Sequence, residues 1–245
     1  MPLRIGCDLD GVLADMDAGL LREAEALFGK GVARQLEESA EATTPDVEQD
    51  DAAGSRPESS PPPVRLHITP RQERRLWRHI ETVENFWEGL AEIEPGVVKK
   101  LASLAVERRW EIIFLTKRPE SAGATAQVQT QRWLQSKGFA LPSVFVVQGS
   151  RGRIASALSL DVVIDDRPEN CLDVVMDSKR ARAILVRRDD STQLPPAAQR
   201  LGIGIVKSVS ECLDILTQLD GPDKDEPGVM ARVKKLLGLG ESASA

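Results

Sequence analysis

The sequence predicts an α/β fold, namely a doubly wound, Rossmann-like parallel sheet with helices on both faces and a small helical cap inserted after the first strand. Two observations predict this fold. Outside residues 15–91, short β-branched runs alternate with amphipathic stretches, which is typical of parallel strands joined by crossover helices. Directly after the first short run, two segments with apolar residues at helical spacing interrupt the alternation and indicate a cap.

The strands are expected where β-branched and other apolar residues are densest. These runs are residues 3–7, 111–115, 144–147, 162–164, 183–186 and 203–206. Amphipathic spacing predicts helices of the core at residues 96–108, 124–137, 153–160, 170–177 and 210–219. The cap helices are expected at residues 15–28 and 70–87, where Leu20 and Ala24, then Leu76 and Ile80, repeat at helical spacing.

These elements divide the chain into three parts. Residues 1–14 and 92–220 form the predicted catalytic core, and residues 15–91 form the cap. Within the cap, residues 37–63 are rich in Ser, Pro and acidic residues and have almost no large apolar side chain, so we expect a disordered loop there. Residues 221–245 are expected to be a tail that contains a short amphipathic helix.

Composition and charge restrict the class of protein. Of the 245 residues, 41% are hydrophobic and 29% charged, as in ordinary globular proteins. The formal net charge is −6, but the acidic loop alone is more negative than that, so the remainder is slightly positive and could attract an anionic ligand. A basic stripe, an apolar membrane span and a signal peptide are all lacking, which predicts a cytoplasmic protein that binds neither nucleic acid nor membrane.

Chemically reactive side chains follow three of the predicted strands. Asp8 and Asp10 come after the first strand, Thr116 after the second, and Asp165 and Asp166 after the fourth. Because ligands bind beyond the carboxyl ends of the strands in such sheets, we expect these groups to converge. Carboxylates gathered in this way require a divalent cation, and oxygen ligands with no nearby His or Cys favour Mg²⁺.

Such a magnesium site predicts a phosphate substrate, because Mg²⁺ commonly takes phosphate oxygens as ligands. Two neighbouring carboxylates can then divide the chemistry. One attacks phosphorus to form an aspartyl-phosphate, while the other gives a proton to the leaving oxygen and later takes one from water. The Thr116 hydroxyl and the free amides of the turn would hold the phosphoryl oxygens.

Three motifs resemble those of a known superfamily. Residues 8–12 (DLDGV), 115–116 (LT) and 164–166 (IDD) are similar to the first, second and fourth motifs of the haloacid dehalogenase superfamily of phosphohydrolases, over roughly residues 3–175. Within that superfamily, residues 8–15, the run 84–88 (ENFWE) before 94–96 (EPG), and residues 164–168 resemble the 5'(3')-deoxyribonucleotidase branch.

The resemblance implies a role for each site residue and a small nucleotide phosphomonoester as substrate. Asp8 would be the nucleophile, Asp10 the general acid and base, and Thr116 a phosphate binder. The implied Mg²⁺ ligands are Asp8, the Asp10 carbonyl and Asp165, with Asp166 orienting metal-bound water.

The cap side and the loop after the second strand supply further expected contacts. Phe86 and Trp87 would stack on the nucleobase, although aromatic residues at this spacing could equally anchor the cap to the core. Lys117 and Arg118 are expected to contact the phosphate or sugar, with solvated loop cations as the alternative.

One motif departs from the superfamily pattern. Its third motif usually provides a Lys, whereas residues 148–153 offer only arginines, of which Arg151 is favoured and Arg153 comes second. A guanidinium is a planar fork, not a compact point charge, so the two cations are not equivalent. The sequence therefore predicts a Mg²⁺-dependent phosphomonoesterase that resembles a 5'-nucleotidase. The alternatives are a phosphatase for another small phosphomonoester or a catalytically weakened binding protein. The sequence does not determine the oligomeric state, and a homodimer is one of the options.

Overall fold

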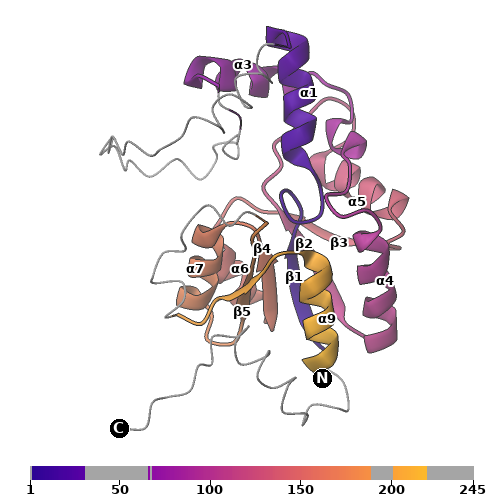
Figure 1. The fold of residues 1–245 in the computed structure, drawn as a ribbon, viewed down its shortest axis with the longest axis vertical. Coiled ribbons are helices and arrows are strands. Elements are labelled where there is room, and N and C mark those ends of the chain that lie inside the picture. Colours follow the sequence, from indigo (N-terminus) through magenta and orange to yellow (C-terminus); the bar gives the residue numbers. More distant parts are fainter. Residues whose placement is uncertain (1, 31–65, 67, 189–200, 220–245) are drawn as a thin grey trace.

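The computed structural model describes residues 2–30, 66, 68–188 and 201–219 (Figure 1). Two expectations, the acidic loop at residues 37–63 and the helix in the 221–245 tail, lie outside the described residues. Among the helices that the structure describes, none combines the length and the apolar character needed to cross a membrane.

The described core is built on one six-stranded parallel sheet, which confirms the predicted fold class. Its strands are β1 (Arg4–Asp8), β2 (Glu111–Thr116), β3 (Ser143–Val146), β4 (Val162–Asp165), β5 (Arg182–Val186) and β6 (Gly204–Val206). The strand order is β3-β2-β1-β4-β5-β6, so the direction of winding reverses between β1 and β4. In doubly wound sheets, this reversal opens a crevice at the carboxyl ends of the strands.

Helices cover both faces of the sheet because its strands are apolar on both sides. In β2, Ile112 and Phe114 contribute to one core, while Ile113 and Leu115 contribute to the other. The first core also includes residues of α4 (Val97–Arg108), α5 (Ala126–Ser136) and α9 (Val209–Leu219). The second includes residues of α6 (Arg151–Ala157) and α7 (Pro168–Asp177), which lie together on the opposite side of the sheet in Figure 1.

The cap helices are α1 (Met16–Phe28) and α3 (Pro70–Ile80), which pack against each other beyond the carboxyl edge of the sheet (Figure 1). The carboxylate of Asp15 caps α1 by accepting a 2.9 Å hydrogen bond from the backbone N–H of Ala18. Thr69 and Gln72 form a capping box at the start of α3. Both helices therefore begin where their own sequence satisfies the free amides of the first turn.

The predicted helix over residues 70–87 was too long, since α3 ends at Ile80. The Thr82 hydroxyl donates to the His79 carbonyl at 2.7 Å, and Asn85 adopts a left-handed conformation with φ of 51°. A separate 3-10 turn, η1 (Phe86–Gly89), follows. The prediction also placed the start of α6 too late, because Ser150 caps that helix and it begins at Arg151.

The chain enters and leaves the cap through two segments, residues 13–15 and 91–93, which are hydrogen-bonded to each other and which we call the neck. Ala14 and Glu92 form an isolated antiparallel bridge. The Asp15 N–H donates to the Ala91 carbonyl, and the Ile93 N–H donates to the Leu13 carbonyl, both at 2.9 Å. The two ends of the insert are thus held side by side next to the end of β1.

Candidate active site

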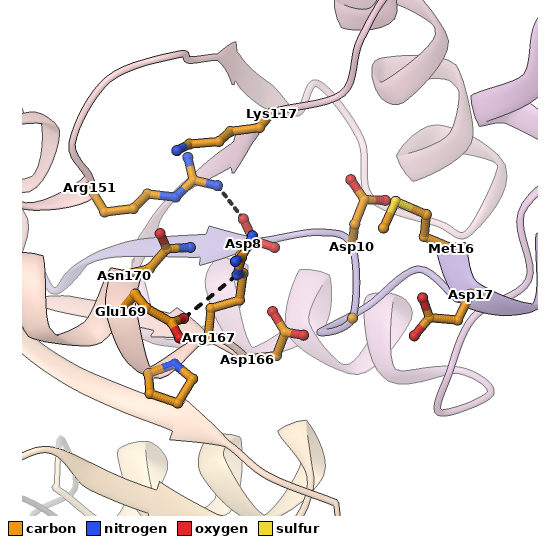
Figure 2. A pocket seen from close by; sticks show the side chains of 12 residues that line it. Asp8, Asp10, Met16, Asp17, Lys117, Arg151, Asp166, Arg167, Glu169 and Asn170 are labelled. Carbon is orange, nitrogen blue, oxygen red and sulfur yellow. Dashed lines mark hydrogen bonds and ion pairs between the residues drawn. The ribbon is translucent and has the colours of Figure 1, made fainter. Parts of the chain in front are cut away.

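The three predicted strand ends lie next to one another, because β1 runs between β2 and β4. Asp8 is in register with Leu115 of β2, one residue before Thr116, and Cys7 is in register with Ile164, one residue before Asp165. A pocket of about 270 Å³ opens beside these ends (Figure 2). Its lining residues are Asp8, Asp10, Gly11, Met16, Asp17, Lys117, Arg151, Asp166, Arg167, Pro168, Glu169 and Asn170.

Three carboxylates form a compact cluster at this pocket. One oxygen each from Asp8, Asp165 and Asp166 lies within 4.8 Å of the others. Burial, followed by the charge of Asp165, raises the pKa of Asp8 well above its ordinary value, although Arg151 opposes the shift. Burial also raises the pKa of Asp165 against the same arginine. It is therefore costly to keep these carboxylates ionised side by side. Their oxygens are the ligands that a hard divalent cation prefers, so such a cation fits the cluster.

Arg151 is the cation that the structure places inside the cluster. Its Nη2 donates to Asp8 Oδ1 (Figure 2), and its Nε lies 3.5 Å from Asp165 Oδ2. Its buried Nε and Nη1 have no hydrogen-bond partner among the described residues, and because Nε is ion-paired with Asp165, Nη1 is the nitrogen left for a ligand. Arg153, by contrast, is exposed, and its backbone N–H serves the Ser150 cap.

Asp165 is held in place by contacts that sequence reasoning missed. Asn170 donates from Nδ2 to both carboxylate oxygens at 3.0 Å, and the Arg167 N–H donates to Oδ1 at 2.9 Å. An available signal was position, because Asn170 lies in the first turn of α7 and so returns toward the aspartate that precedes the helix.

The turn after β1 approaches Asp166 so closely that it requires glycine. Gly11 has a φ of +85°, and a Cβ there would lie 2.1 Å from Asp166 Oδ2. Arg188, which sequence reasoning also missed, supports this turn by donating to the carbonyls of Gly11 at 2.6 Å and Val12 at 2.9 Å. The only sequence signal for Arg188 was a cation shortly after β5, and no residue near it in the sequence indicated that it contacts the turn after β1.

Asp10 lies at the wall of the pocket, and its carboxylate also contacts residues at and after the end of β2. Its Oδ2 accepts a 3.0 Å hydrogen bond from the Thr116 hydroxyl. Its carboxylate is also ion-paired with Arg118, whose side chain is fully buried. Lys117 lines the pocket, whereas Thr116 and Arg118 do not. The structure thus turns two of the expected substrate contacts toward Asp10.

The structure does not bring Phe86 and Trp87 to the pocket. Both are buried, and their rings meet edge to face with centroids 4.8 Å apart. The Trp87 backbone N–H donates to Gln129 Oε1 at 3.1 Å, and its indole Nε1–H donates to the Pro119 carbonyl at 3.0 Å. These contacts favour the core-anchoring alternative over base stacking, because no ring face is open to a nucleobase.

Comparison with known proteins reveals similarity in fold. No protein-family model and no curated protein matches the chain. A HAD family hydrolase from Deinococcus radiodurans R1, solved with bound phosphate and sodium, superposes with a TM-score of 0.51 at 16% identity, over 89% of this chain and 96% of that one. The chain has the fold of a haloacid dehalogenase-family (HAD) hydrolase. A haloacid dehalogenase-like family hydrolase from Xanthomonas campestris superposes with a lower TM-score of 0.46 at 14% identity, over 89% of this chain and 92% of that one. A hydrolase from Pseudomonas syringae superposes with a TM-score of 0.47 at 18% identity, over 90% of this chain and 98% of that one.

Proposed function

We propose that this chain is a Mg²⁺-dependent phosphomonoesterase of the HAD superfamily that works through an aspartyl-phosphate on Asp8. The observation that carries the proposal is the convergence of Asp8, Asp165 and Asp166 at a pocket that Lys117 and Arg151 also line. Carboxylates alone would repel a phosphate. Carboxylates together with cations and a divalent metal would form a phosphate site.

The carboxylate cluster is the proposed metal site. Asp8, Asp165 and Asp166, together with the Asp10 carbonyl, would hold Mg²⁺, and the raised pKa of buried Asp8 indicates that a cation is needed to keep the cluster charged. When bound, the metal would supply positive charge that screens the nucleophile from the phosphate. Asn170 keeps both oxygens of Asp165 in a fixed orientation for that purpose.

The chain's own residues would divide the reaction between them. Lys117 and the free Nη1 of Arg151 would hold the phosphate oxygens against Asp8. An Asp8 oxygen forms a bond to phosphorus while the bond from phosphorus to the leaving oxygen breaks, and that oxygen takes a proton from Asp10. Water then attacks phosphorus, Asp10 takes the proton of the water, and inorganic phosphate leaves Asp8.

Nucleoside monophosphates are the proposed substrates, and the motifs that resemble the deoxyribonucleotidases are their support. The buried positions of Phe86 and Trp87 remove the expected stacking platform. A pocket of about 270 Å³ is at the small end for a ligand site, and this favours the alternative of another small phosphomonoester.

Phosphate release from a panel of nucleotide, sugar and aryl phosphates, with Mg²⁺ and with chelator, tests the proposal. We expect Mg²⁺-dependent turnover that Asp8→Asn abolishes. Equal rates for the native chain and Asp8→Asn would refute catalysis through Asp8. Phosphate binding without turnover would favour a weakened binding protein instead.

A matched pair of arginines tests the departure from the usual lysine. Arg151→Lys should retain or raise the rate, because an ammonium there still screens Asp8 from the phosphate. Arg153→Lys is the control, since exposed Arg153 contacts neither aspartate of the cluster. A collapse of activity in Arg151→Lys alone would show that the reaction requires the separate contacts of the guanidinium fork and not only its charge.

A further inference from the structure

Arg118 is a fully buried cation whose guanidinium donors are directed to two side chains. Its Nε lies 3.0 Å from both carboxylate oxygens of Asp10, and its Nη2 donates to Asp10 Oδ1 at 2.7 Å. Its Nη1 donates to the Thr130 hydroxyl at 2.9 Å. With these contacts made and no exposed surface, Arg118 has no access to a phosphate in the pocket.

The surroundings of Arg118 fix its position. The guanidinium carbon lies 4.9 Å from the ring centroid of Trp87 and 5.9 Å from that of Trp133. Thr130 is anchored in turn, because its hydroxyl donates to the Ala126 carbonyl at 2.7 Å. The indole of Trp87 binds the carbonyl of Pro119, the residue that follows Arg118. A cation packed in this way is preorganised, since its side chain cannot move without losing several contacts.

Asp10 differs from Arg118 in that it keeps access to the pocket. Its side chain is 12% exposed and lines the pocket beside Asp8. Oδ1 accepts from both Nη2 and Nε of Arg118, while Oδ2 accepts from the Thr116 hydroxyl and shares Nε. Each oxygen thus accepts two hydrogen bonds, but one of the two donors on Oδ2 is the Thr116 hydroxyl, which can rotate away, so Oδ2 is the oxygen that can exchange a proton with a ligand.

We propose that Arg118 is a positioning residue for proton transfer by Asp10, an inference that rests on the proposed phosphomonoesterase function. Arg118 touches neither substrate nor phosphorus. It holds the Asp10 carboxyl so that a proton passes from Oδ2 to the leaving oxygen as the bond from that oxygen to phosphorus breaks and the Asp8–phosphorus bond forms. Losing Arg118 would leave Asp8 able to attack and Asp10 free to rotate.

Two aryl phosphates of nearly equal size separate this role from a structural one. The phenolate of phenyl phosphate needs a proton as it leaves, whereas the nitrophenolate of 4-nitrophenyl phosphate is stable without one. General acid catalysis contributes about 10²- to 10⁴-fold. We therefore expect Arg118→Met and Arg118→Lys to lower kcat/KM at least about tenfold more for phenyl phosphate than for 4-nitrophenyl phosphate.

The same measurement on three further variants makes the test specific. Asp10→Asn should show the same asymmetry, and Arg118→Met combined with Asp10→Asn should lose no more than Asp10→Asn alone. Arg132→Met is the matched control, because it removes an arginine that is ion-paired with Glu88 and has no contact with Asp10. It should affect both substrates equally.

Each result decides between the two proposals. Equal losses for the two substrates in the Arg118 variants, with asymmetry in Asp10→Asn, would overturn the positioning role and leave the phosphatase intact. If the Met variant does not fold, the Lys variant, which keeps the charge but not the fork, decides alone. Absence of Mg²⁺-dependent turnover of either substrate by the native chain would refute the proposed function itself, and the inference with it.

Discussion

Replacing Gly11 by alanine should damage the metal site more than the fold. The added Cβ would lie 2.1 Å from Asp166 Oδ2 and 2.7 Å from its Cγ, so the carboxylate must leave its place in the cluster. The left-handed backbone, with φ of +85°, adds about 1–2 kcal/mol of strain for a residue with a Cβ. Gly29→Ala is a matched control, because Gly29 has φ of +88° and no described neighbour within 4 Å of the place its Cβ would take.

The assay is the melting temperature of both variants, with and without Mg²⁺. In chelator, each should melt several degrees below the native chain, at about 2–4 °C per kcal/mol for a protein of this size. Gly29→Ala should keep the native Mg²⁺-induced rise. A tenfold weaker affinity in Gly11→Ala would remove about 1.4 kcal/mol of that stabilisation. An equal Mg²⁺ response in the two variants would refute the idea that Asp166 is part of the site.

Three further predictions concern Asp8, Gly152 and Glu94. Asp8→Asn should melt at or above the native chain in chelator, because burial and its acidic neighbour raise the pKa of Asp8 and make its ionised form costly; a large fall in melting temperature would contradict this. Gly152→Ala should lower the free energy of unfolding by about 1–3 kcal/mol, since its Cβ would lie 2.0 Å from the Asp173 carbonyl, and chemical denaturation will measure it. Glu94→Gln should destabilise the protein at neutral pH but progressively less in acid. Although burial opposes the shift, hydrogen bonds lower the pKa of Glu94, so its contribution is present above the ordinary value of 4.5 and is lost as the pH falls through the native pKa. A pH-independent difference between the two proteins would exclude that linkage.

The strands and the convergence of their ends could be read from the sequence. Every strand lies within one residue of its predicted bounds, because the β-branched runs are short and clearly delimited. Parallel strands bring their carboxyl ends to the same edge, so a common edge for Asp8, Thr116 and Asp165 was predictable, whereas their adjacency depends on the sheet order, which places β1 between β2 and β4.

The direction of individual side chains was harder to predict. β2 ends at Thr116, and the Arg118 N–H donates back to the Thr116 hydroxyl at 3.2 Å. Both side chains reach Asp10, while Lys117 lines the pocket. What fixes the outcome is tertiary, because the Trp87 ring and the Thr130 hydroxyl that surround Arg118 come from segments that local patterns cannot place.

The sequence left two roles open for the aromatic pair for a related reason. Residue type shows that Phe86 and Trp87 pack against something, but it does not distinguish a ligand from the core. The distinction comes from Gln129 and Pro119, which engage both polar groups of Trp87.

Because of the neck at residues 13–15 and 91–93, the free energy of the sheet depends little on the size of the cap between these segments. Backbone hydrogen bonds close the neck beside the sheet, so the sheet meets the same pair of adjacent ends whatever number of residues lies between them. Lengthening a loop that is already closed costs little, since the entropy of closure grows only with the logarithm of length. Evolution, or an engineer, can therefore exchange this part of the chain for another of different size while the carboxylates at the end of β1 keep their geometry.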